Sequence, residues 1–215
     1  MSKLFFLAGV LLLASCSKER ITGSGDNTAE ERNTGTFTRV SLATGVRVHI
    51  SKAPNFQVLV QGYRNLLPYI QTKVSGNTLE ISSSANTSLT NNNVEVYITL
   101  PQIEEARNSS SANIDIKGEF DADLFNAYVS GSGNIDAQGR NISIIGADLS
   151  GSGSIRAFGV PAAEADVHLS GSGSVEVTAY VRLTAHVSGS GNVYYKGGPV
   201  VQSYLTGSGF VIRRD

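Results

Sequence analysis

The chain has 215 residues, a formal net charge of −1 at pH 7 and 40 % hydrophobic residues. This length suits one or two domains, and the balanced charge excludes a strongly basic nucleic-acid-binding protein. Only 16 % of the residues are charged, and 23 are glycine. The surface must therefore consist largely of uncharged polar side chains.

The first 16 residues have the pattern of an export signal. Lys3 supplies a positive charge, residues 4–13 are apolar, and Leu13-Ala14-Ser15-Cys16 follows. The apolar stretch is too short to span a membrane, and the whole pattern resembles that of bacterial lipoproteins. The resemblance implies a signal peptide over 1–15 and a lipid anchor on Cys16, and Ser17 at the next position favours the outer membrane. The alternative is an ordinary signal peptide that contains a cysteine by chance.

Residues 16–35 are polar apart from Ile21. Such a composition cannot form a hydrophobic core, and it predicts a flexible tether between the membrane and the folded part of the chain.

Residues 36–107 have the alternation of apolar and polar residues that is typical of β-strands. The segments 46–50, 56–60 and 94–98 alternate in this way, Ser75-Gly76-Asn77 predicts a hairpin turn, and 82–93 predicts a long polar loop. We expect this N-terminal β-strand region either to form the first coils of the fold that follows or to cap its end, because an uncovered sheet edge invites aggregation.

Six near-copies of one short sequence run through residues 108–215. They are SSSANI, SGSGNI, SGSGSI, SGSGSV, SGSGNV and TGSGFV, and they begin at residues 109, 130, 150, 170, 188 and 206. A period near 20 residues, with glycines at fixed positions and no helical pattern, predicts an all-β parallel solenoid, or β-helix, with one coil per repeat. Crossovers between parallel strands are usually right-handed, so we expect a right-handed solenoid. We also expect 36–215 to form one continuous domain.

Alignment of the repeats predicts which side chains face the core. Aliphatic residues precede the first Ser or Thr of each repeat: Val129, Leu149, Leu169, Val187 and Leu205. Others follow five positions after it: Ile135, Ile155, Val175, Val193 and Val211. Aliphatic residues at equivalent positions of successive coils are what stacked parallel strands require.

The glycines of each repeat are expected to form tight corners, because glycine adopts positive φ without a Cβ clash. These corner glycines are Gly131, Gly133, Gly151, Gly153, Gly171, Gly173, Gly189, Gly191, Gly207 and Gly209.

Outward-facing aromatic and imidazole side chains are the best candidates for a binding surface. They are Tyr128, Tyr194, Tyr195, Tyr204, His168 and His186. Outward aromatic rings on a rigid ladder can stack on sugar rings or anchor a protein partner. They can equally well serve only to cover the sheet.

Other chemistry has little support in the sequence. The Gly-Ser-Gly segments lack the following helix of a phosphate-binding loop. A calcium ladder needs a repeated oxygen ligand, but the equivalents of Asp136 include Arg156 and Tyr194. We therefore expect no cofactor, no metal and no catalytic residues.

Two alternatives stay open. His168 and His186 occupy equivalent positions with Asp148 one repeat earlier, an arrangement that suits a metal site or a pH-sensitive patch. Asp136 and Glu176, two repeats apart, give weak support to a polysaccharide-processing enzyme.

An ordered set of short motifs runs along residues 36–212: Phe37-x-x-Val40, then Gly45-Val46-Arg47-Val48, residues 77–81 and 96–101, and the serial Ser-Gly-Ser-Gly turns. With this set, the region resembles the head GIN domain family of bacterial autotransporter adhesins. The resemblance implies a β-helical domain in an exported protein, and it brings no catalytic residue. The expected function is that of a non-enzymatic envelope lipoprotein that binds a surface glycan or protein, and the alternatives are the enzyme or a structural envelope protein.

Overall fold

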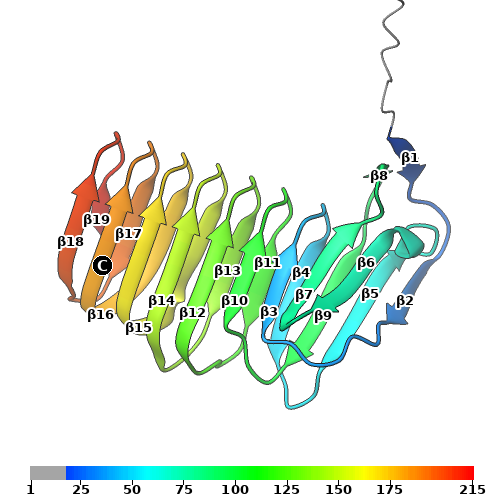
Figure 1. Cartoon of the computed structure of the whole chain (residues 1–215), viewed down its shortest axis with the longest axis horizontal. Coiled ribbons are helices and arrows are strands. Elements are labelled where there is room, and N and C mark those ends of the chain that lie inside the picture. Colours follow the sequence, from blue (N-terminus) through cyan, green and yellow to red (C-terminus); the bar gives the residue numbers. More distant parts are fainter. Residues whose placement is uncertain (1–17) are drawn as a thin grey trace, which may run out of the picture.

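The computed structural model describes residues 18–215, so the signal peptide and Cys16 lie outside the described residues. The described chain is all-β, with one short 3-10 helix, η1 (Leu67–Tyr69). Within 18–215, no helix is long and apolar enough to cross a membrane. Nearly all strands join one large mixed sheet in which parallel pairs predominate (Figure 1).

The parallel strands form two rows, and each repeat contributes to both of them. The first strand row consists, in order, of β7 (Thr78–Ser83), β3 (Arg39–Leu42), β10 (Glu105–Asn108), β12 (Ala122–Val129), β14 (Ile142–Leu149), the second halves of β15 (Ser154–Leu169) and β16 (Ser174–Val187), and β18 (Val200–Leu205). The second strand row consists of β9 (Glu95–Leu100), β4 (Arg47–Lys52), β11 (Ile114–Lys117), β13 (Asn134–Gln138), the first halves of β15 and β16, β17 (Asn192–Lys196) and β19 (Val211–Arg213).

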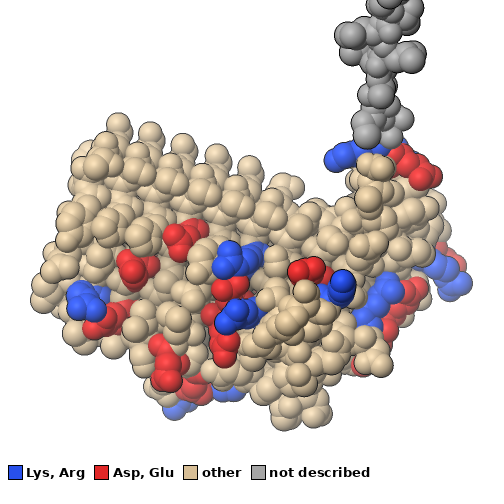
Figure 2. Space-filling model, in the orientation of Figure 1, with Lys and Arg blue, Asp and Glu red and all other residues tan. Residues whose placement is uncertain are grey.

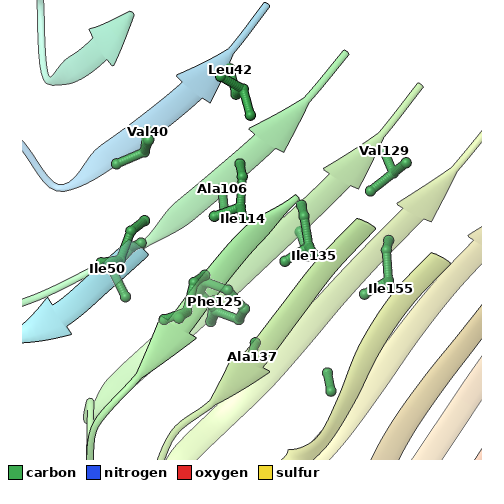
Figure 3. Close-up of a cluster of buried hydrophobic side chains, with 14 of the residues drawn as sticks. Val40, Leu42, Ile50, Ala106, Ile114, Phe125, Val129, Ile135, Ala137 and Ile155 are labelled. Atoms are coloured by element: carbon green, nitrogen blue, oxygen red, sulfur yellow. The ribbon is translucent and has the colours of Figure 1, made fainter. Parts of the chain in front are cut away.

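The strand register follows the sequence repeat. Ile114 pairs with Ile135, and Ile135 pairs with Ile155. All three are fully buried, as is Val129 of the first row at 1 % exposed. Figure 3 shows Ile135 and Ile155 pointing from the second row into the space that Val129 enters from the first row. The prediction is thus confirmed for these residues and for Leu149, Leu169, Val175, Val187 and Val193. It is wrong for the last repeat, where Leu205 is 46 % exposed and Val211 is only partly buried, because no further strand pairs with β18 or β19 within residues 18–215.

The N-terminal segment is folded, so the flexible tether predicted for 16–35 is wrong where the structure describes it. β1 (Glu19–Thr22) pairs in parallel with β8 (Thr87–Thr90), and β2 (Asn27–Glu31) pairs antiparallel with β5 (Gln57–Tyr63). The predicted loop 82–93 likewise contains β8. Backbone hydrogen bonds to neighbouring strands hold these polar segments in place. A prediction from side-chain hydropathy misses them, because such bonds do not depend on the side chains.

Residues 36–107 form both stacked layers and a cap. Three layers stack here in an order that differs from the chain order. The layer made of β3 and β4 is in the middle, with the β7–β9 layer on one side and the β10–β11 layer on the other. β5 adds antiparallel to β9, and β6 (Ile70–Ser75) forms with β7 the hairpin that the sequence predicts, at Gly76 with φ +59°. One hydrophobic core runs from Phe37 to Val193.

The corner glycines serve a different purpose from the one predicted. None of the ten has a positive φ. Instead, a Cβ on Gly153 would lie closer than 3.0 Å to the carbonyl oxygen of Gly133, and the same overlap recurs at every later corner. The first repeat has Ser110 and Ala112 at these positions. Glycine is required for the close approach of successive corners.

Candidate ligand-binding groove

One line of outward side chains crosses the first strand row. Parallel register places Arg107 beside Tyr128, then Asp148, His168, His186 and Tyr204 in successive strands. We call these six residues the groove row. Neighbouring strands are about 4.8 Å apart, so the groove row presents one functional group at each such step.

A second line of side chains lies two residues further along each strand, at the corners, and lines the same groove. It contains the first Ser or Thr of each repeat: Ser109, Ser130, Ser150, Ser170, Ser188 and Thr206. We call these residues the serine row. The two rows together line one groove of about 660 Å³. In Figure 2, the edge formed by the corners carries no Lys, Arg, Asp or Glu in view, because the repeat corners contain none.

The rings of the groove row stack on one another. The centroids of His168 and His186 are 4.8 Å apart with planes 2° from parallel, and those of His186 and Tyr204 are 4.6 Å apart at 9°. The guanidinium of Arg107 lies 3.9 Å from the ring centroid of Tyr128. Much of the ring-face area is thus covered within the protein. The predicted stacking of these rings on sugars is therefore revised: the groove row offers mainly ring edges and their polar atoms.

The two histidines do not form a convergent metal site. The nitrogen lone pairs of an imidazole lie in the ring plane, and those of two parallel rings 4.8 Å apart do not converge on one ion. His168 Nε2 lies 3.5 Å from a carboxylate oxygen of Asp166. Among residues 18–215, no group of three or more His, Cys, Asp or Glu side chains is placed to hold a metal ion.

The charges in the groove are few. Arg107 Nε donates a hydrogen bond of 2.5 Å to Glu105, and this bond raises the pKa of Arg107 above its ordinary value. Arg107 is therefore cationic at physiological pH. Asp148 is the acidic member of the groove row. A groove with one cation, one carboxyl group and many hydroxyl groups suits an uncharged polar ligand better than a highly charged one.

The structure brings together four of the six predicted binding residues. Tyr128, Tyr204, His168 and His186 line the groove. Tyr194 lies on the second strand row, where the guanidinium of Arg214 is 4.5 Å from its ring centroid, and Tyr195 packs against the core. The alignment of repeats places Tyr194 on a different row from Tyr204, so this separation could have been expected.

Sequence reasoning missed Arg107 and the serine row as parts of the site. Arg107 precedes Tyr128 by 21 residues, which is one repeat, and this spacing is the signal that could have identified it.

The second strand row carries the carboxylates that the enzyme hypothesis would use. Asp115, Asp136, Arg156 and Glu176 occupy successive strands and line a depression of about 210 Å³. Both carboxylate oxygens of Asp136 accept hydrogen bonds of 3.0 Å from Arg156. Since Asp136 is held in this ion pair, it is poorly prepared to act as a general base.

His49 and Tyr97 extend this second row toward the N-terminal end. Their rings stack with centroids 4.9 Å apart, and Tyr97 donates a hydrogen bond of 2.5 Å to Glu95. That hydrogen bond is the largest of the effects that raise the pKa of Tyr97, so its hydroxyl stays protonated at neutral pH.

Comparison with known proteins gives one family and several similar folds. The chain is similar to a putative adhesin from Bacteroides fragilis (TM-score 0.76, 18 % identity, 90 % of this chain and all of that one). It is also similar to a putative lipid binding protein from Parabacteroides distasonis (TM-score 0.58, 21 % identity, 92 % of this chain and all of that one). The chain is similar as well to a putative adhesin from the same species (TM-score 0.55, 22 % identity, 91 % of this chain and all of that one). No curated protein matches the chain.

The solved structures share the fold, and a family model gives the stronger assignment. The model described as "Putative auto-transporter adhesin, head GIN domain" matches residues 36–199, which include both strand rows except β18 and β19, and most of the groove. The resemblance seen in the sequence is thereby confirmed: this chain belongs to the head GIN domain family of auto-transporter adhesins.

Proposed function

We propose that the protein is a non-enzymatic envelope lipoprotein whose groove binds an extended, hydroxyl-rich chain such as a surface glycan. The observation that carries the proposal is the alignment of the groove row and the serine row over six successive strands. Each strand adds hydrogen-bonding groups at the same place. Membership in an adhesin family supports a role in the envelope or at the cell surface.

The polar atoms of the groove suit a ligand with many hydroxyl groups. Tyrosine and serine hydroxyls both donate and accept hydrogen bonds, as neutral imidazole does through its two nitrogens. One such hydrogen bond contributes about 0.5–1.5 kcal/mol net, so useful affinity requires several along one ligand. A repeated array supplies them, whereas a single repeat does not.

The repeat architecture supplies the rigidity that the proposal needs. In our interpretation the two strand rows are the faces of one right-handed parallel β-solenoid with a coil per repeat, supported by the repeat-by-repeat register. Rigid presentation lowers the ordering cost on binding.

In the proposed envelope location, Cys16 carries the lipid and the outer membrane is the site of anchoring. Only Ser17 and Lys18 separate Cys16 from β1. The anchor would therefore hold the folded domain close to the bilayer. We expect Cys16→Ser to abolish incorporation of a labelled fatty acid and to release the protein from the membrane fraction, while Ser17→Ala retains both. Equal labelling of the Cys16→Ser variant would contradict lipidation at this residue.

The groove is tested by removing hydroxyl groups without changing ring shape. On an array of glycans and matrix proteins, the wild-type chain is expected to bind an extended glycan. The double variant Tyr128→Phe, Tyr204→Phe should weaken that binding about tenfold, since two hydrogen bonds are lost. Tyr194→Phe, the same substitution on the second strand row, should have no effect.

Two outcomes would count against this function. If the wild-type chain binds no glycan on the array, or if Tyr194→Phe weakens binding as much as the groove variant, the groove is not the binding site. Turnover of a polysaccharide that is lost in Asp136→Ala, Glu176→Ala would favour the enzyme instead. Absence of both binding and turnover would favour a structural envelope role.

A further inference from the structure

The last repeat leaves the end of the core open. β18 pairs with β16 on one side, and all six of its residues are exposed. Val201 and Leu205 occupy core positions but are 37 % and 46 % exposed, whereas their counterparts Leu183 and Val187 are at most 1 % exposed. Within residues 18–215, β18 pairs with no strand but β16, and β19 with none but β17, so the outer edges of both are free.

The opposite end of the fold is protected. There, β6 adds antiparallel to β7, and β2 adds antiparallel to β5. β2 carries Glu30 and Glu31, and β6 carries Lys73. Charged side chains on edge strands discourage further pairing. β18, with the sequence VVQSYL, has no charge, proline or glycine.

The free backbone groups of β18 lie on alternate residues. The N–H of Thr206 donates to the carbonyl of Val187 in β16. Since backbone groups alternate sides along a strand, those of Val201, Ser203 and Leu205 point away from β16. These three residues are symmetric about Ser203. A second β18 in antiparallel orientation would therefore place Val201 opposite Leu205 and Ser203 opposite its own copy.

The last repeat is also more apolar than the others at an outward position. Phe210 is 62 % exposed. The equivalent residues of the earlier repeats are all Asn or Ser: Asn113, Asn134, Ser154, Ser174 and Asn192. Phe210 thus adds an exposed apolar ring to the last repeat, beside the uncovered end of the core.

We propose that this end binds a second copy of the chain, forming a dimer with a two-fold axis at Ser203 and antiparallel pairing of the two β18 strands. A two-fold contact uses the same surface on both copies and closes on itself. The protected N-terminal end excludes open head-to-tail growth by strand addition. The pairing covers Val201 and Leu205 and completes the backbone hydrogen bonds of both edges.

The dimer is tested by blocking the edge without disturbing the pairing to β16. Ser203→Pro removes an N–H that points outward, and proline is tolerated on edge strands in that orientation. Ser203→Ala keeps the N–H and is the matched control. Phe210→Asn, which installs the residue found in three other repeats, is an independent variant that leaves β18 unchanged.

The readout is the mass of the purified full chain over a concentration series, by sedimentation equilibrium, with circular dichroism to verify folding. Wild type and Ser203→Ala should have twice the mass of one chain. Ser203→Pro and Phe210→Asn should raise the dissociation constant at least tenfold. A wild-type monomer at every concentration, mass growth without limit, or a folded Phe210→Asn dimer as tight as wild type would overturn the proposal.

Discussion

Gly153→Ala is expected to destabilise the fold by about 3 kcal/mol or more, among the largest effects of any single substitution in this chain. The new Cβ would overlap the carbonyl oxygen of Gly133 in the preceding corner. Because that oxygen belongs to the backbone of a stacked strand pair, it cannot move aside without separating two repeats. A lower midpoint of urea unfolding, followed by circular dichroism, is the measurement.

Gly45→Ala is the matched control for this substitution. Gly45 also lies in a corner, but its φ is not positive and a Cβ there would meet nothing within 4 Å. Alanine at such a site stabilises by about 0.4–1 kcal/mol, because it restricts the unfolded chain. Equal midpoints for Gly153→Ala and wild type would show that successive corners are not in close contact.

Ile155→Ala is expected to lower the free energy of unfolding by about 2–5 kcal/mol, because it removes buried methyl and methylene groups and leaves a cavity in the core. Ile155 is fully buried between Ile135 and Val175. The neighbouring strand carries a suitable control in Ile144, which is 40 % exposed.

The same urea titration distinguishes the two isoleucine variants. Ile144→Ala should change stability by less than about 1 kcal/mol, as exposed substitutions usually do. A comparable loss of stability in both variants, or no loss in either, would contradict the assignment of Ile155 to the buried core and of Ile144 to the surface.

The repeats made the core of this fold predictable, whereas the chain segments outside them were harder to interpret. The repeat period and the alternation of apolar and polar residues are both patterns of side chains, so they identify Ile135 and Ile155 as buried. The strands β1, β2 and β8 are polar and depend on backbone pairing with distant segments. The insertion of β3 between β7 and β10 depends on long-range contacts that no local pattern encodes.

Asn108 shows another limit of reasoning from repeats. It occupies the core position of Val129, and it is 1 % exposed. Its side-chain amide donates to the carbonyls of Ala112 and Asn134, at 2.7 and 3.1 Å, and its oxygen accepts from the N–H of Ser110. A hydrogen-bonded asparagine thus replaces an aliphatic residue where the first corner lacks glycines.

The candidate site was predictable in its position and less so in its chemistry. Repeat spacing alone aligns Tyr128, His168, His186 and Tyr204. Whether their faces or their edges meet the ligand depends on rotamers, and the stacking of His168 on His186 settles that question only in three dimensions. Whether the serine row lines the same groove likewise depends on how the corner turns.

The dependence of affinity on ligand length tests most directly the central claim that six strands form one continuous binding groove. The dissociation constants of a bound glycan and of its shorter fragments would be measured by calorimetry. Affinity is expected to rise with length until the ligand spans about 25 Å, which is six strands about 4.8 Å apart, and then to level off. A monosaccharide that binds as tightly as the longest chain would contradict the claim.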